Sequence, residues 1–240
     1  FFVAFVCGLL LALSHHKRTD ICLRPAQRSG PPANDPGPKF LDEETDRYLD
    51  SVLLEYSRTK HARNSLLISN HPSTEGFGSR MTGLLSAFYL SLALNFSMAV
   101  HWSLRPRLVE NKMAYMIRLS EVFDTNHTLV PLETESYSPN RTIFFGYAGA
   151  RRAKQLARSM DYWGCSDFIT DLQNAGMIKF TTTVWMLPLI RRNAAVGHYP
   201  FIQRTRFYKG LYRKLAAFLF RPSRNVATQA RQIVAELLTD

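Results

Sequence analysis

The chain has 240 residues, enough to bury a full core as one large domain or as one domain with appendages. Its three cysteines have neither the number nor the spacing of a metal site. Thirty lysines and arginines against 19 aspartates and glutamates give a net charge of +11, which suits an anionic partner. Neither a zinc-type spacing nor a nucleic-acid motif accompanies this charge, so nucleic acid is disfavoured as that partner.

The chain begins with an apolar run, FFVAFVCGLLLAL, over residues 1–13. As a helix this run reaches about 20 Å, short of the roughly 30 Å of a bilayer core. It therefore resembles the core of a signal peptide or the remnant of a signal anchor. Residues 24–39 are rich in proline and glycine and cannot bury enough apolar surface to order themselves. We expect a membrane or secretory segment at 1–13, a flexible stem at 14–39 and a folded domain at 40–240.

The folded domain opens with a strand, turn, helix and strand between Leu66 and Trp102. Apolar runs at Leu66–Ile68 and Met98–His101 predict two strands. Between them a helix from Ser79 to Asn95, with Ser79 as its N-cap, is predicted by one apolar face. That face consists of Met81, Leu84, Leu85, Phe88 and Leu92. This order predicts two parallel neighbouring strands joined by a crossover helix.

The turn before this helix is the candidate binding loop, with the sequence Gly76-Phe77-Gly78-Ser79-Arg80. Its two glycines allow a close backbone approach, and backbone N–H groups at a helix N-terminus suit an anionic or polyhydroxyl ligand. A simpler interpretation is that the glycines only turn the chain. Arg80 is either a contact to a phosphate or a residue of the helix surface.

The rest of the chain predicts further strands and helices of an α/β domain with a mainly parallel sheet, Rossmann-like and three-layered. The expected helices are Arg107–Phe123, Ala148–Met160, Phe201–Phe220 and Asn225–Leu238, and the expected strands are Thr128–Leu132, Thr142–Tyr147 and Phe180–Leu189.

Two segments resemble a known family. GFGSRMTGLLSAFYLSLALNFSMAVHW, from Gly76, is similar to the opening of the fucosyltransferase-type glycosyltransferases of the xyloglucan and nodulation-factor kind. Phe218-Leu219-Phe220-Arg221-Pro222-Ser223, with the helix after it, resembles the segment that closes their acceptor-side half. The resemblance implies the N-terminal half of a GT-B fold, with the Gly76–Arg80 loop lining the cleft. It also implies an inverting transfer of fucose from the donor GDP-fucose to a glycan acceptor without a metal or other cofactor.

The family places a His-x-Arg strand after this region, and the sequence stops at Asp240 without it. The resemblance therefore implies that the catalytic residues lie beyond Asp240 and that these 240 residues alone are inactive. An anchor, a stem and an α/β domain are the usual layout of a Golgi enzyme with a lumenal domain, an argument by analogy. Sequons at Asn126 and Asn140 suit this compartment, whereas one at Asn95 ends a helix. Cys22 and Cys165 are a possible disulfide pair or free thiols.

Two other functions stay open. Asn70-His71-Pro72-Ser73 resembles part of the His-x4-Asp motif of glycerolipid acyltransferases, with His71 as base, but Gly76 stands where the aspartate belongs. A membrane-associated acyltransferase is thus one alternative. The other is a non-catalytic basic binding module, because eleven basic residues and no acidic one lie between Lys179 and Arg231. Phe207, Leu211, Leu215 and Phe218 instead predict a helix whose apolar stripe faces inward and whose basic residues face solvent.

Overall fold

The structure is a computed structural model that describes residues 42–71, 77–102, 118–130, 139–145, 162–182 and 185–239. The chain separates into two compact units, Phe1–Lys39 and Phe40–Asp240, and the described residues all belong to the second. The expected membrane segment at 1–13 and stem at 14–39 lie outside the described residues. Of the helices that the structure describes, none is long and apolar enough to cross a membrane.

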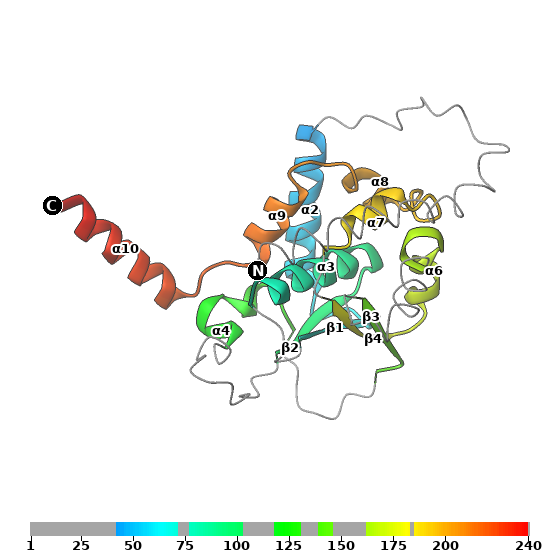
Figure 1. Cartoon of the computed structure of the whole chain (residues 1–240), viewed down its shortest axis with the longest axis horizontal. Coiled ribbons are helices and arrows are strands. Elements are labelled where there is room, and N and C mark those ends of the chain that lie inside the picture. Colours follow the sequence, from blue (N-terminus) through cyan, green and yellow to red (C-terminus); the bar gives the residue numbers. More distant parts are fainter. Residues whose placement is uncertain are drawn as a thin grey trace, which may run out of the picture. The chain divides into compact units, whose positions relative to one another are not determined.

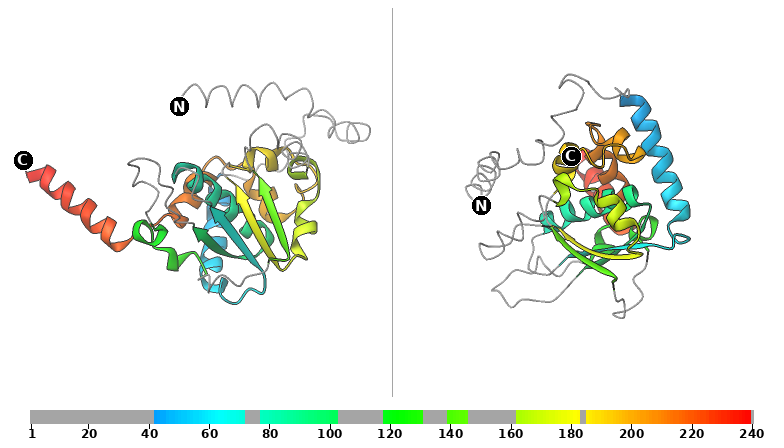
Figure 2. Two further views of the ribbon diagram at one scale, coloured as in Figure 1. Left: turned by 60° about the horizontal axis from the view of Figure 1, so that its bottom comes forward. Right: turned by 90° about the vertical axis from the view of Figure 1, so that its right-hand side faces the viewer.

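Four strands form one sheet in which every pair of neighbours is parallel (Figures 1 and 2). The strands are β1 (Leu66–His71), β2 (Ser97–Trp102), β3 (Arg141–Phe145) and β4 (Met177–Thr182), in the order β2-β1-β4-β3. The two central strands carry fully buried apolar side chains, as expected for parallel strands. This sheet and the helices beside it confirm the predicted α/β class.

The predicted unit of two parallel strands and a connecting helix is confirmed. β1 pairs with β2 from Leu66↔Ser97 to His71↔Trp102, and helix α3 (Phe77–Leu94) connects them. At Gly83 a Cβ atom would lie 1.9 Å from the carbonyl oxygen of Thr182, so the helix backbone lies directly against the end of β4. Only a residue without a side chain fits there.

Helix α3 is buried on every side from Gly83 to Leu92, more completely than the one predicted apolar face requires. Helices α2 (Asp42–Thr59) and α9 (Leu211–Leu219) lie on the same side of the sheet as α3 (Figure 2). The ring of Phe88 stacks on Phe218 at 5.6 Å and meets Tyr56 edge-on at 5.2 Å. The predicted three-layer arrangement also requires helices on the opposite face of the sheet, and the described residues include no helix there.

The other described elements are shorter or lie toward the end of the chain. They are α4 (Leu119–Val122), the 3-10 helix η5 (Thr125–His127), α6 (Phe168–Gln173), α7 (Leu187–Arg192), α8 (Pro200–Thr205) and α10 (Arg224–Thr239). The predicted last helix is thus confirmed. The single helix predicted for Phe201–Phe220 is wrong, because α8 and α9 are separated by a turn in which the Tyr208 ring packs closely against Gly210.

The predicted strand Phe180–Leu189 is wrong in its second half. β4 ends at Thr182, and Pro188 lies in the first turn of α7. Proline suits that position because the first N–H groups of a helix have no partner within it. Sequence alone does not distinguish a proline that ends a strand from one that starts a helix.

The strand predicted from Thr128 is also wrong over the described residues 128–130. The preceding residues form η5, and the Lys60 ammonium donates to the carbonyl oxygens of Asn126 and His127 at 2.6 and 2.7 Å. These two bonds hold the segment in a tight turn. β3 confirms the predicted strand at Thr142 as far as Phe145. The helix predicted for 148–160 and most of that for 107–123 lie outside the described residues.

The inward apolar stripe predicted around α9 is confirmed in part. Leu211, Leu215 and Leu219 are buried, and Phe218 is partly buried against the core. Phe207 is 63% exposed, because the turn at 206–210 separates it from α9. The prediction was wrong for that residue.

Candidate functional site

The candidate site lies at the carboxyl edge of the sheet. Because all four strands are parallel, their C-terminal residues meet at one edge, and α3 begins beside the end of β1. Ligands of open parallel sheets bind at this edge. Since neighbouring residues of a strand point to opposite faces, the edge has two sides, one toward α3 and one away from it.

Four residues of the predicted binding loop form the first turn of α3, and Gly76 lies outside the described residues. Helix α3 begins at Phe77, so Ser79 is its third helical residue and not its N-cap. The side chain of Ser79 is exposed. A Cβ atom on Gly78 would meet nothing within 4 Å. The first N–H groups of a helix have no acceptor within it, so this open turn offers backbone donors to a ligand.

Arg80 belongs to the interior and not to the helix surface, because it is only 2% exposed. Its guanidinium lies 4.8 Å from the centroid of the Trp102 ring, at the end of β2. Phe77 meets the same tryptophan edge-on at 6.0 Å and stacks on Phe123 at 6.5 Å. Arg80 and Trp102 therefore fix the start of α3 to the end of β2, while Phe77, 38% exposed, forms the open rim.

His71, on the α3 side, is fully buried. Its Nε2 atom lies 2.7 Å from the hydroxyl of Ser69, and its Nδ1 atom has no hydrogen-bond partner within the described residues. Burial, helped by the nearby charges of Arg80 and His101, lowers the pKa of His71 to about 3. The imidazole is therefore neutral at physiological pH and shielded from solvent. This environment counts against His71 as the base of an acyltransferase.

On the opposite side a hydrogen-bonded row crosses three strands. Asn70 of β1 pairs in register with His101 of β2, and its Oδ1 atom lies 2.8 Å from His101 Nδ1. The Asn70 amide nitrogen donates to the hydroxyl of Thr181 in β4 at 3.0 Å. An amide oxygen only accepts, so His101 Nδ1 carries the hydrogen. The Nε2 atom of the exposed imidazole is then the lone-pair nitrogen whenever the ring is neutral.

Sequence reasoning missed this row. His101 ended a predicted strand and Asn70 followed one, so both were polar residues at strand ends of a parallel sheet. Polar residues at the ends of parallel strands often contact ligands, and this was the sequence signal that could have identified the row. Thr181 was missed because the predicted strand Phe180–Leu189 placed it near the start of a strand, whereas it lies near the end of β4.

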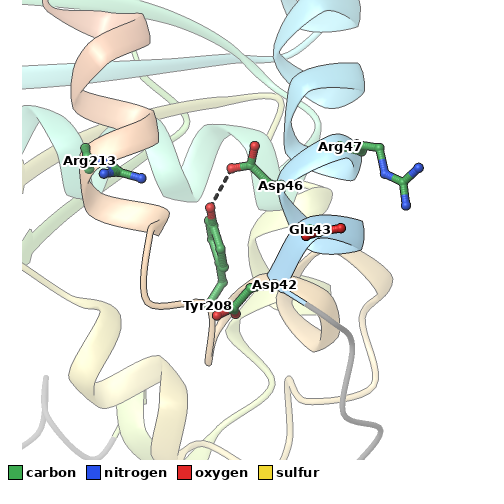
Figure 3. Close-up of a pocket in the computed structure, with 6 residues that line it drawn as sticks. All are labelled: Asp42, Glu43, Asp46, Arg47, Tyr208 and Arg213. Atoms are coloured by element: carbon green, nitrogen blue, oxygen red, sulfur yellow. Dashed lines mark hydrogen bonds between the residues drawn. The ribbon is translucent and has the colours of Figure 1, made fainter.

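A separate pocket of about 500 Å³ opens between α2 and the α9 region (Figure 3). Tyr208 donates to Asp46 at 2.5 Å, and the Lys214 ammonium lies 2.6 Å from Asp46 and 2.8 Å from Asp50. Hydrogen bonds from Lys214 and Tyr208 hold the pKa of Asp46 below its usual range. The contacts of Asp46 with Tyr208 and Lys214 join α2 to the α9 region. Its lining residues are Asp42, Glu43, Asp46, Arg47, Tyr208 and Arg213.

Several basic residues of the segment between Lys179 and Arg231 also make contacts within the fold. The guanidinium of Arg204 lies over the Tyr48 ring at 4.7 Å, and that of Arg206 over Phe207 at 4.8 Å. Arg191 donates to the carbonyl oxygen of Arg206. These contacts agree with the interpretation of a solvated helical surface. The described ranges contain no group of three or more His, Cys, Asp or Glu side chains that would hold a metal.

The sequons differ in their surroundings. Asn126 is exposed within η5. Asn140 is exposed, but its amide nitrogen donates to the carbonyl oxygen of Ala175 at 2.7 Å. Asn95 is exposed and ends α3 with a φ of 60°. Glycosylation of Asn126 and Asn140 stays a prediction. Cys165 is disulfide-bonded, so it is not a free thiol.

Comparison with known proteins gives similarity to solved structures but no match to a family model or a curated protein. Among solved structures, the chain resembles a mutant of Arabidopsis thaliana FUT1 in complex with GDP, with 10% sequence identity and a TM-score of 0.44. The match covers 75% of this chain and 46% of that one, so the chain spans less than half of this neighbour's length.

Proposed function

We propose that this chain is the acceptor-side half of a glycosyltransferase that moves fucose from GDP-fucose to a glycan acceptor in the Golgi lumen. The observation that carries the proposal is the carboxyl edge of the parallel sheet. There the open first turn of α3 and the row from His101 to Thr181 offer hydrogen-bonding groups to a phosphate and to a polyhydroxyl ligand. The resemblance of the Gly76–Trp102 segment to fucosyltransferase-type enzymes supports the choice of donor.

Two further features support this proposal. The disulfide at Cys165 suits the oxidising environment of the secretory pathway. Furthermore, the acyltransferase alternative lacks an accessible base. An acyltransferase needs His71 as an open base, and His71 is fully buried. The basic binding module is less favoured, because Arg204 and Arg206 of its segment pack on aromatic rings of the same fold.

The proposal is tested by assaying the purified full-length protein with labelled GDP-fucose and a panel of glycan acceptors. Gly78→Trp places a large ring in the first turn of α3, where the added Cβ atom itself meets nothing within 4 Å. We expect fucosyl transfer by the wild type and a loss of about 100-fold in Gly78→Trp, because a blocked backbone contact to the donor is of that order.

Gly78→Ala is the matched control, since its methyl group fills little of the same space and should leave transfer within about threefold. Transfer that survives Gly78→Trp unchanged would remove this turn from the site. Absence of transfer with every acceptor would contradict the proposed activity itself.

A further inference from the structure

The row from His101 to Thr181 is built like the support of a proton acceptor. The first requirement of such a group is a fixed tautomer, and Asn70 supplies it by accepting from Nδ1 of His101 at 2.8 Å. The second requirement is that the residue supporting the histidine is itself fixed in place. Thr181 fixes Asn70, because its hydroxyl accepts a hydrogen bond from the Asn70 amide nitrogen at 3.0 Å. Since the three residues lie on neighbouring strands, the sheet backbone sets their spacing.

The third requirement is access to a ligand, and His101 meets it because its side chain is exposed. The two histidines of this edge differ here, because His71 points to the α3 side and is fully buried.

We propose that His101 is a catalytic residue, namely the general base that deprotonates the acceptor hydroxyl, and that Asn70 is its positioning residue. This inference rests on the proposed function. The acceptor O–H gives its proton to Nε2 of His101, and the oxygen lone pair forms the new bond to the anomeric carbon of the sugar. The bond from that carbon to the diphosphate breaks, and its electron pair leaves with the nucleoside diphosphate. The imidazolium then returns its proton to water.

The test compares His101→Gln with the wild type in the full-length protein. We expect kcat to fall by about 100-fold or more, the usual contribution of a general base, while KM stays within about threefold. The melting temperature should be unchanged, because the side chain is exposed. His61→Gln, another exposed histidine and one that lies in the turn after α2, is the matched control and should keep wild-type activity.

Asn70→Leu tests the positioning role. It should lower kcat by about tenfold through loss of the fixed tautomer, with a smaller effect than His101→Gln. Nitrogen-15 spectra of the imidazole should show the hydrogen on Nδ1 of His101 in the wild type and a mixture of tautomers in Asn70→Leu. In His101→Gly, added imidazole should restore part of the activity, which a purely structural role does not allow.

Two outcomes separate the proposals. Fucosyl transfer that proceeds at the wild-type rate in His101→Gln would overturn the role of His101 and leave the proposed function standing. No transfer by the wild type with any acceptor would overturn the proposed function, and this inference with it.

Discussion

The carboxyl edge of the sheet carries two histidines on adjacent strands, and the structure gives them opposite surroundings. His71 of β1 faces α3, is fully buried and has a pKa lowered to about 3. His101 of β2 faces the other way, is exposed and is anchored through one ring nitrogen by Asn70. Both residues are histidines near the same edge of the sheet, so neither the residue type nor the position along the strand explains their different surroundings. The face of the strand explains the difference, because side chains on one face pack into the core and those on the other face meet solvent.

The difference divides the edge into a packed side and a side with open hydrogen-bonding groups. On the packed side Gly83, Arg80 and Trp102 bring α3 tightly against the strand ends. Changes there should alter stability first. On the side of His101, changes should alter activity and leave stability nearly intact. Two substitutions on the packed side and one in the pocket between α2 and α9 test this division, beginning with the largest effect.

Gly83→Ala should be the most destabilising of the three. The added Cβ would lie 1.9 Å from the carbonyl oxygen of Thr182, so α3 has to move away from β4. We expect a loss of about 3 kcal/mol in the free energy of unfolding, measured by chemical denaturation. Gly78→Ala, in open space on the same helix, should change stability by less than about 1 kcal/mol. Equal stability of the two variants would show that the packed side is looser than the structure indicates.

His71 should make stability depend on pH in the mildly acidic range. Its pKa in the folded protein is about 3 against an ordinary value of 6.5, so between these values the unfolded chain binds more protons. Stability is fully present above pH 6.5 and falls as the pH drops toward 3. Between pH 7 and pH 5 the loss from this residue should be about 2 kcal/mol.

In His71→Gln, which does not titrate, that part of the pH dependence should disappear from denaturation curves. His127 has a pKa lowered mainly by burial and acts in the same direction. His127→Gln is therefore measured beside it to separate the two contributions. Unfolding curves of His71→Gln that keep the full pH dependence of the wild type would contradict the buried, neutral state of His71.

Asp46→Asn should have the smallest effect. The carboxylate belongs to the pocket between α2 and α9, is 42% exposed and shares Lys214 with Asp50. We expect a loss of at most about 1 kcal/mol in stability and no change in transfer, because a partly exposed ion pair contributes little. A tenfold fall in transfer rate with unchanged stability would instead move the ligand site to this pocket.

Sequence patterns predicted the elements whose period was clear. The apolar runs at Leu66 and Met98 and the apolar face between Met81 and Leu92 predicted the β1-α3-β2 unit and its parallel pairing. Local sequence did not determine the strand near Thr182, because Pro188 suits both the end of a strand and the start of a helix. The sequence also gave no sign that Lys60 would fix residues 125–128 as a tight turn, since that contact joins distant segments.

The candidate site was predictable only in outline. The predicted loop lies between β1 and α3, where Phe77, Gly78 and Ser79 form the open first turn of the helix, and its role in binding stays a prediction. The row from His101 to Thr181 was not predictable, because it depends on the order β2-β1-β4 and on the register between strands far apart in sequence. Likewise, only packing decides that Arg80 is an interior residue over Trp102.

The most direct test measures fucosyl transfer from labelled GDP-fucose and the melting temperature for the wild type, His101→Gln and His71→Gln of the full-length protein. We predict transfer by the wild type, a loss of about 100-fold or more at an unchanged melting temperature in His101→Gln, and a lower melting temperature in His71→Gln, whose folded fraction retains much of its activity. Undetectable transfer by the wild type with every acceptor, or full transfer by His101→Gln, would contradict the account.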